Sequence, residues 1–255
     1  MIFGTGDIHG NPYFKLSEEA FPEQHEMTKN DYLFISGDFG CVFNHKGETK
    51  QEKEKLDWLE SRNFTTLFCD GNHENFDRLN AYPTEEWNGG LVHKIRPSVI
   101  HLMRGQVYTI NDKKFFVFGG ARSHDIKDGI LEMDDPRIPE WWNDRTKLFR
   151  INRFDWWEQE MPSEYEMKTG LENLAKHNFK VDYIITHEMP TSTLTLYCAL
   201  YNSAGFYKPD KLNDYLEDIR TKTEYTHWFC GHYHDDKHIT QKESVLMDQI
   251  VFVTD

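Results

Sequence analysis

Residues 2–10 read Ile-Phe-Gly-Thr-Gly-Asp-Ile-His-Gly, a short apolar run that stops at a glycine turn carrying Asp7 and His9. The same pattern recurs along the chain, with an apolar run followed at once by a small turn that holds Asp, Asn or His. Short apolar runs bounded by glycine-containing turns are typical of buried strands. The runs with this pattern are 2–4, 32–36, 65–69, 181–186 and 227–230. They predict a frame of buried β-strands with polar residues at the strand ends.

Helices with recognisable starts lie between these strands. Thr49-Lys-Gln-Glu52 and Ser163-Glu-Tyr-Glu166 are capping boxes, which mark helix N-termini. Asp210 can cap a third helix, because the apolar residues that follow it repeat at the spacing of an amphipathic helix. The N-terminal third therefore predicts alternating strands and helices, which indicates parallel strands covered by helices. Residues 91–118 hold several β runs and no helix, and they predict added antiparallel strands. The fold class is mixed α/β.

The length and composition suit one folded domain over residues 1–255. Hydrophobic residues make up 38% of the chain and aromatic residues 15%, enough for a substantial core, which excludes a disordered chain. The segment from about 122 to 162 differs, because it holds four tryptophans in two pairs (Trp141-Trp142 and Trp156-Trp157). We interpret it as an insertion that forms a small core of its own or a wall or lid over the active site.

The charge and the cysteines limit the classes of partner and the compartment. With 29 basic and 43 acidic residues the net charge is −14, which would repel nucleic acid and anionic membranes, so neither is an expected partner. No apolar run is long enough to span a bilayer, and the N-terminus lacks the features of a signal peptide. Four scattered cysteines without a CxxC pair favour a reducing cytoplasm. The oligomeric state stays open.

The polar residues at the strand ends have the chemistry of a metal site. Ligands of open α/β sheets bind outside the carboxyl ends of the strands, where residues distant in sequence converge. Carboxylate, amide and imidazole groups without a cysteine suit manganese, iron, zinc or nickel. Their number exceeds what one ion needs and matches two ions that share a carboxylate. The converging set is Asp7, His9, Asp38, Asn72, His73, His187, His232 and His234.

Taken together, these motifs resemble those of the calcineurin-like metallophosphoesterases. The match is to Gly6-Asp7-Ile8-His9-Gly10, Gly37-Asp38, Gly71-Asn72-His73-Glu74, His187 and Gly231-His232-Tyr233-His234. The resemblance implies two mixed β-sheets packed as a sandwich and flanked by helices, with a dinuclear metal site at one edge. It also implies hydrolysis of a phosphomonoester or phosphodiester, in which a water molecule that bridges two divalent ions attacks phosphorus.

The resemblance also implies a role for each residue. The metal ligands would be Asp7, His9 and His234 for the first ion, Asn72, His187 and His232 for the second, and Asp38 as a bridge between both. The catalytic residues would be Asp38 and His73, with His73 as the proton donor to the leaving group. Asn72 would also contact the substrate. We expect two divalent ions, manganese foremost, with iron, zinc or nickel as alternatives.

One departure from the family pattern bears on the substrate. Serine/threonine protein phosphatases of this superfamily carry an Asp and an Arg where this chain has Cys41 and Val42. Arg122 is a substitute phosphate-binding residue, or else a surface arginine paired with Asp125 or Asp128. The alternatives to a small-molecule phosphoesterase are a protein phosphatase acting on phosphoproteins and a metal-bearing binding protein without catalysis.

Another expectation concerns the acidic residue after His73. Metal sites usually have residues that orient the ligating histidines. Glu74 follows His73 and Glu188 follows His187 in the chain, so each either orients a histidine or is a solvated loop acid, and we favour the first role for Glu74.

Overall fold

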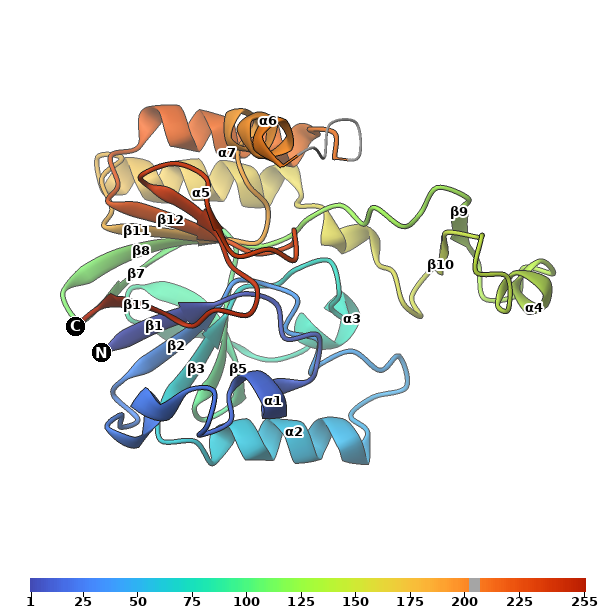
Figure 1. Cartoon of the computed structure of the whole chain (residues 1–255), viewed down its shortest axis with the longest axis horizontal. Coiled ribbons are helices and arrows are strands. Elements are labelled where there is room, and N and C mark those ends of the chain that lie inside the picture. Colours follow the sequence, from blue (N-terminus) through green and yellow to red (C-terminus); the bar gives the residue numbers. More distant parts are fainter. Residues whose placement is uncertain (202–206) are drawn as a thin grey trace.

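Two large β-sheets pack face to face between layers of helices in the computed structural model, which describes residues 1–201 and 207–255 (Figure 1). The space between the sheets is filled by apolar side chains from both, and Phe34 of the first sheet stacks on Phe115 of the second at 5.0 Å between ring centroids. The predicted mixed α/β sandwich flanked by helices is confirmed. No helix in the two described ranges has the length and apolarity needed to cross a membrane.

The first sheet has the strand order β15-β1-β2-β3-β6-β5-β4. Its central strands β1, β2, β3 and β6 run parallel, and the flanking strands are antiparallel to their neighbours. Nearly every residue of β1 to β3 is buried, as expected for parallel strands that are covered on both faces. The strands are β1 (Ile2–Thr5), β2 (Tyr32–Ile35), β3 (Thr65–Phe68), β4 (Thr84–Trp87), β5 (Gly90–Arg96), β6 (Val99–Leu102) and β15 (Val251–Thr254).

The second sheet has the strand order β13-β14-β12-β11-β8-β7. Here β8, β11, β12 and β14 run parallel, and β7 and β13 are antiparallel at the edges. The strands are β7 (Gln106–Ile110), β8 (Lys113–Phe118), β11 (Tyr183–Thr186), β12 (His227–Cys230), β13 (Lys237–His238) and β14 (Glu243–Val245). Residues 91–118 thus form antiparallel hairpins as predicted, but the hairpins belong to different sheets, because the chain crosses between the sheets after β6.

Helices cover the outer face of each sheet. Leu56 and Leu59 of α2 pack on the first sheet, and Leu212 and Leu216 of α7 pack on the second. The predicted capping boxes at the starts of α2 and α5 and the Asp210 cap of α7 are all present. The helices of the body are α1 (Pro12–Lys15), the 3-10 helix η1 (Pro22–His25), α2 (Lys50–Glu60), α3 (Phe76–Leu79), α5 (Glu164–Lys176), α6 (Thr191–Leu200) and α7 (Lys211–Lys222).

The tryptophan-rich segment has two parts. Its distal part consists of β9 (Gly129–Leu131), α4 (Ile138–Trp141) and β10 (Phe149–Ile151), and it projects from the sheets as an arm (Figure 1). Trp141 packs on Phe149 within this arm, so the arm has a small aromatic cluster of its own. The base of the segment, with the 3-10 helix η2 (Glu158–Glu160), returns to the body, where the buried Trp157 donates a hydrogen bond to Asp77. The role of a wall or lid stays a prediction.

A buried ion pair joins the crossing segment to the end of β3. The Arg104 guanidinium donates to Asp70 Oδ2 through Nε at 2.8 Å and Nη2 at 2.5 Å, and both side chains are almost fully buried. His101 Nε2 lies 3.1 Å from the other oxygen of Asp70. The guanidinium holds the pKa of Asp70 well below its usual range in spite of burial. Removing one member of such a pair leaves an uncompensated charge in the interior.

We therefore expect Arg104→Met to lower the free energy of unfolding by ~3–5 kcal/mol, because it leaves the buried Asp70 carboxylate without its positively charged partner. The Asp70→Asn/Arg104→Met double variant should recover part of this loss, since no charge is then left buried. The matched control is Arg153→Met, whose side chain is 65% exposed in its pair with Asp77 and should change stability by less than ~1 kcal/mol. Urea unfolding measures all three. Equal losses for Arg104→Met and Arg153→Met would contradict the assignment.

Candidate metal centre

The polar turns at the ends of five strands meet at one edge of the sandwich. β1, β2 and β3 lie in the first sheet, and β11 and β12 lie in the second. The two sheets touch at this edge, since the backbone N–H of His232, after β12, donates to Asp7, after β1, at 3.1 Å to Oδ1 and 3.2 Å to Oδ2. The sandwich therefore brings together side chains that are more than 200 positions apart in the chain, because the parallel strands of both sheets end here.

Four of these residues form the outer half-site: Asp7, His9, Asp38 and His234. Each offers one ligand atom, and the four atoms lie within 4.8 Å of one another. His9 Nε2 lies 2.9 Å from His234 Nε2, which in turn lies 3.5 Å from Asp7 Oδ2. Both carboxylates are buried, whereas both imidazoles are exposed. This half-site therefore faces solvent through its histidines.

The inner half-site, made of Asp38, Asn72, His187 and His232, is buried. His187 Nε2 lies 3.3 Å from both Asp38 Oδ1 and Asn72 Oδ1. The Nδ1–H of His187 donates to the Ser36 carbonyl at 2.7 Å, which directs Nε2 toward the other donors. The ring of His232 packs beside that of His187, with 4.9 Å between centroids. Three oxygen and nitrogen donors thus converge on one point, with His232 beside them.

Asp38 belongs to both half-sites. Its Oδ1 faces His187 Nε2 at 3.3 Å, and its Oδ2 faces His9 Nδ1 at 3.7 Å. A carboxylate with one oxygen toward each half can be shared by two cations. Oxygen and imidazole donors without a thiolate suit first-row divalent ions, so the residues present fit two such metal ions.

The backbone of four of these residues is strained. His9, Asp38, His232 and His234 have positive φ angles of 44°, 42°, 70° and 49°, in the left-handed region that side chains rarely adopt. Such conformations cost ~1–3 kcal/mol each and persist only where the surrounding structure enforces them, most often at functional sites. The strain therefore marks this edge of the sandwich independently of side-chain chemistry.

Glycines beside the site make room for the ligands. A Cβ atom at Gly71 would overlap Asp38 Oδ1, one at Gly37 would overlap the His187 ring, and one at Gly231 would overlap Asp7 Oδ1. Gly71 and Gly231 are thus required for the close approach of functional side chains, whereas Gly37 is required for this approach and also for its positive φ of 94°.

The buried carboxylates create a strong preference for positive charge. Burial alone would raise the pKa of Asp38, but the neighbouring imidazoles, His187 foremost, hold it well below its usual range. Burial alone would lower the pKa of His187, but the carboxylates of Asp38 and Asp7 raise it to about 10. His232 differs, because burial and the adjacent His187 hold its pKa well below the usual value. The buried negative charge of Asp38 therefore favours a bound cation.

His73 lies beside the outer half-site and outside its group of four. Its backbone N–H donates to Asp38 Oδ1 at 2.8 Å, and its ring packs edge-on against His9 at 5.3 Å between centroids. The side chain is partly exposed. This position agrees with the expected proton donor, a role that stays a prediction.

Arg122 is exposed on the segment that follows β8. The structure shows the surface position of the alternative but not its pairing: among the described residues, the ion pairs of Asp125 and Asp128 are with Arg150 and Lys147. Arg122 directly precedes Ser123, whose Oγ lies 3.3 Å from Asn72 Nδ2. Arg122 therefore lies near the rim of the site, and its contact with phosphate stays a prediction.

Glu74 has a different task from the one expected. Its buried carboxylate accepts the backbone N–H groups of Phe39 at 2.7 Å and Gly40 at 3.2 Å, so it holds the turn that carries Asp38 and orients no histidine. Glu188 is the acid nearer to a histidine, with Oε2 at 3.9 Å from His232 Nε2. Residue order alone could not separate the two, since each directly follows a motif residue.

The structure places three residues at this site that the sequence analysis did not assign to it: Ser123, His124 and Glu160. His124 Nε2 lies 2.8 Å from His232 Nε2, and Ser123 Oγ lies 3.3 Å from Asn72 Nδ2. Ser123 and His124 follow the buried strand β8, which runs parallel to β11, so they carry the same signal as the motif residues. Glu160 carries no such signal, because it comes from the base of the insertion.

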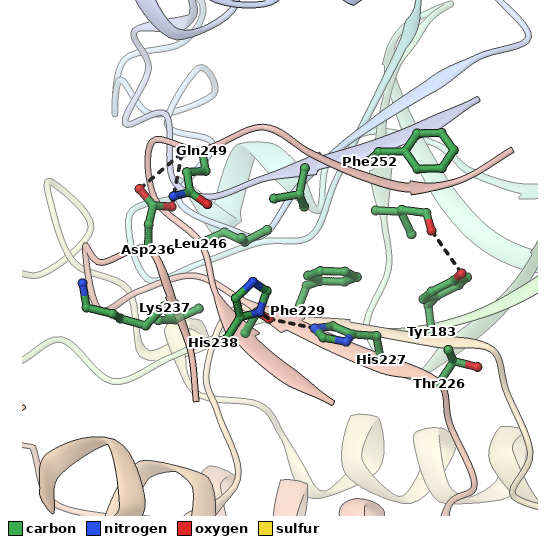
Figure 2. Close-up of a pocket in the computed structure, with 14 residues that line it drawn as sticks. Tyr183, Thr226, His227, Phe229, Asp236, Lys237, His238, Leu246, Gln249 and Phe252 are labelled. Carbon is green, nitrogen blue, oxygen red and sulfur yellow. Dashed lines mark hydrogen bonds between the residues drawn. The ribbon is translucent and has the colours of Figure 1, made fainter. Parts of the chain in front are cut away.

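The structure also has a cavity away from the metal centre. The cavity has a volume of about 450 Å³, and His227 and His238 line it (Figure 2). The two imidazoles lie 2.7 and 2.8 Å from Ser244 Oγ. Its walls come from β12, β13, β14 and the edge strand β15. Within the described residues, its lining includes none of the eight predicted strand-end residues. The metal centre is therefore identified by its donors and strain, and not by the volume of a pocket.

Comparison with known proteins agrees with the motifs. The family model of the calcineurin-like phosphoesterases matches residues 1–236, which include all five strand-end motifs. A search of curated proteins finds no match. The resemblance inferred from the motifs is confirmed, and the chain belongs to the calcineurin-like phosphoesterase family.

Proposed function

We propose that this protein is a hydrolase of phosphomonoesters or phosphodiesters that works with two divalent metal ions. The observation that supports this most directly is the Asp38 carboxylate, which faces His187 with one oxygen and His9 with the other. The family acts on phosphate esters and typically uses two divalent ions, which agrees with the two half-sites.

The outer half-site would hold one ion through Asp7, His9, Asp38 and His234. The inner half-site would hold the other through Asp38, Asn72, His187 and His232. When bound, two such ions supply positive charge for the phosphate oxygens and polarise the attacking water. Manganese is our first choice, with iron, zinc or nickel as alternatives, because these donors accept several first-row ions.

The chain's own residues would do the remaining work. The exposed imidazoles of His9 and His234 leave the outer half-site open, so the ester would enter from that side. His73, with its ring against that of His9, would donate a proton to the leaving oxygen. Asn72 and Arg122 would contact the phosphate group.

The residues of this chain are more consistent with a general phosphoesterase than with a protein phosphatase. Cys41 and Val42 stand where protein phosphatases of the superfamily carry a phosphate-binding pair, and both are fully buried. They therefore cannot take over that role. A binding protein without catalysis would be expected to have lost ligands, whereas all seven positions here carry metal-binding groups.

The first experiment is hydrolysis of a nitrophenyl phosphate monoester and the matching diester by Mn²⁺-loaded and chelator-stripped protein. We expect turnover that disappears with the chelator and returns with metal. The ratio of the two rates distinguishes monoesterase from diesterase. Two bound ions without turnover of either ester would favour the binding-protein alternative.

Asp38→Asn tests the bridging carboxylate. Asn also tolerates a left-handed backbone, so this change removes the ligand charge and keeps the turn. We expect loss of both ions from the desalted protein and a fall in activity of at least ~10²-fold. Asp112→Asn is the matched control, since Asp112 is exposed and has a φ of 59°. Retention of two ions in Asp38→Asn would exclude the bridging role.

His73→Ala tests the proton donor. We expect kcat to fall ~10²–10⁴-fold, because the leaving oxygen loses its acid, with both ions still bound. Metal analysis together with kinetics on the preferred ester measures both quantities. His25→Ala is the control, because its side chain is 59% exposed in a contact with Glu18. If His73→Ala lost an ion, His73 would be a ligand and the assigned role would be wrong.

A further inference from the structure

A buried chain of hydrogen bonds leads from the base of the insertion to Asn72. Asn72 Nδ2 donates to Ser123 Oγ at 3.3 Å, and Ser123 Oγ donates to Glu160 Oε2 at 2.6 Å. The backbone N–H of Ser123 donates to Glu160 Oε1 at 3.0 Å. All three residues are at most 5% exposed, so water does not compete for these bonds.

The chain has a fixed direction when Glu160 is ionised. Burial raises the pKa of Glu160 to about 7, and above this pH its carboxylate can only accept hydrogen bonds, so it draws the single hydroxyl proton of Ser123 to itself. The lone pairs of that hydroxyl then face Asn72 and can be satisfied only by its NH₂ group. The amide oxygen of Asn72 must therefore point the other way, where it lies 3.3 Å from His187 Nε2 in the inner half-site. Divalent ions bind amide oxygen, so this orientation is the one that metal binding requires.

Independent contacts hold Glu160 in place. Arg104 Nη2, paired with Asp70, also donates to the carbonyl of Gln159 at 2.9 Å. The N–H of Gly120 donates to the Asp70 carbonyl at 2.9 Å, which ties the segment of Ser123 to the same loop. The start and the base of the insertion are thus both attached to the loop that carries Asn72.

We propose that Glu160, acting through Ser123, is a positioning residue that sets the Asn72 amide with its oxygen toward the inner metal ion. The inference rests on the proposed function, because it takes Asn72 as a ligand of that ion. It gives the base of the tryptophan-rich insertion a part in metal binding, separate from any contact of the arm with substrate.

The test measures metal binding by Ser123→Ala and Glu160→Gln, with Mn²⁺ alone as the probe. Ser123→Ala removes the link, and Glu160→Gln keeps the size but can donate to Ser123 and so reverse the chain. We expect the affinity for one of the two Mn²⁺ ions, the one in the inner half-site, to fall ~10–100-fold, the usual effect of losing an outer partner of a ligand, and the affinity for the other ion to be unchanged. Titration calorimetry gives both affinities, and electron paramagnetic resonance reports the coupled ion pair.

Glu158→Gln is the matched control, because Glu158 lies in the same short helix and is exposed. It should bind both ions like the parent protein. The double variant Ser123→Ala/Glu160→Gln should lose no more affinity than Ser123→Ala alone, since both changes break one chain. Circular dichroism of the metal-free variants shows whether the fold is kept.

Several results would overturn the inference. These are two Mn²⁺ affinities that both stay within twofold of the parent in Ser123→Ala, additive losses in the double variant, or equal loss of both ions or of the fold in both single variants. The last would mean a general structural role. A parent protein that binds no ion pair would remove the proposed function and this inference with it, whereas an intact pair in all variants would remove the inference alone.

Discussion

The burial of the Asp38 carboxylate is the constraint on which the rest of the site depends. A charge that is 1% exposed must be compensated nearby, and Asp38 has imidazoles on both sides and a backbone N–H from His73. The Glu74 side chain accepts a backbone N–H of the turn that carries Asp38, and Gly71 leaves space for the Asp38 carboxylate oxygen. The neighbourhood is therefore arranged around one negative group that two cations can share.

The sandwich supplies the energy that keeps this arrangement in place. Four strained residues and several buried charges cluster at one edge, each at a cost of order a kcal/mol or more. The apolar layers between the sheets and beneath the helices stabilise the whole, and the Arg104–Asp70 pair fastens the crossing between the sheets next to the site. A precise site of this kind is more readily built on strand ends than on free loops.

Local signals in the sequence predicted much of this structure. The buried strands, the capping boxes and the turns with Asp7, Asp38 and His187 are recognisable because each depends on neighbours in the chain. The division of residues 91–118 between two sheets was not predictable, since antiparallel hairpins look alike in either sheet. The task of Glu74 and the contribution of Glu160 also depend on which backbone packs against them. The roles of the seven proposed ligands remain predictions.

The two half-sites differ in their access to solvent, and this difference has a kinetic consequence. His9 and His234 of the outer half-site have side chains 34% and 58% exposed, whereas His187 of the inner half-site is fully buried. An ion in the inner half-site would therefore be shielded from solvent more than an ion in the outer half-site. The outer ion would then exchange with the medium faster than the inner one. The metal that occupies the deep position would be set early in the life of the protein, and the shallow one would follow the metals available at the time.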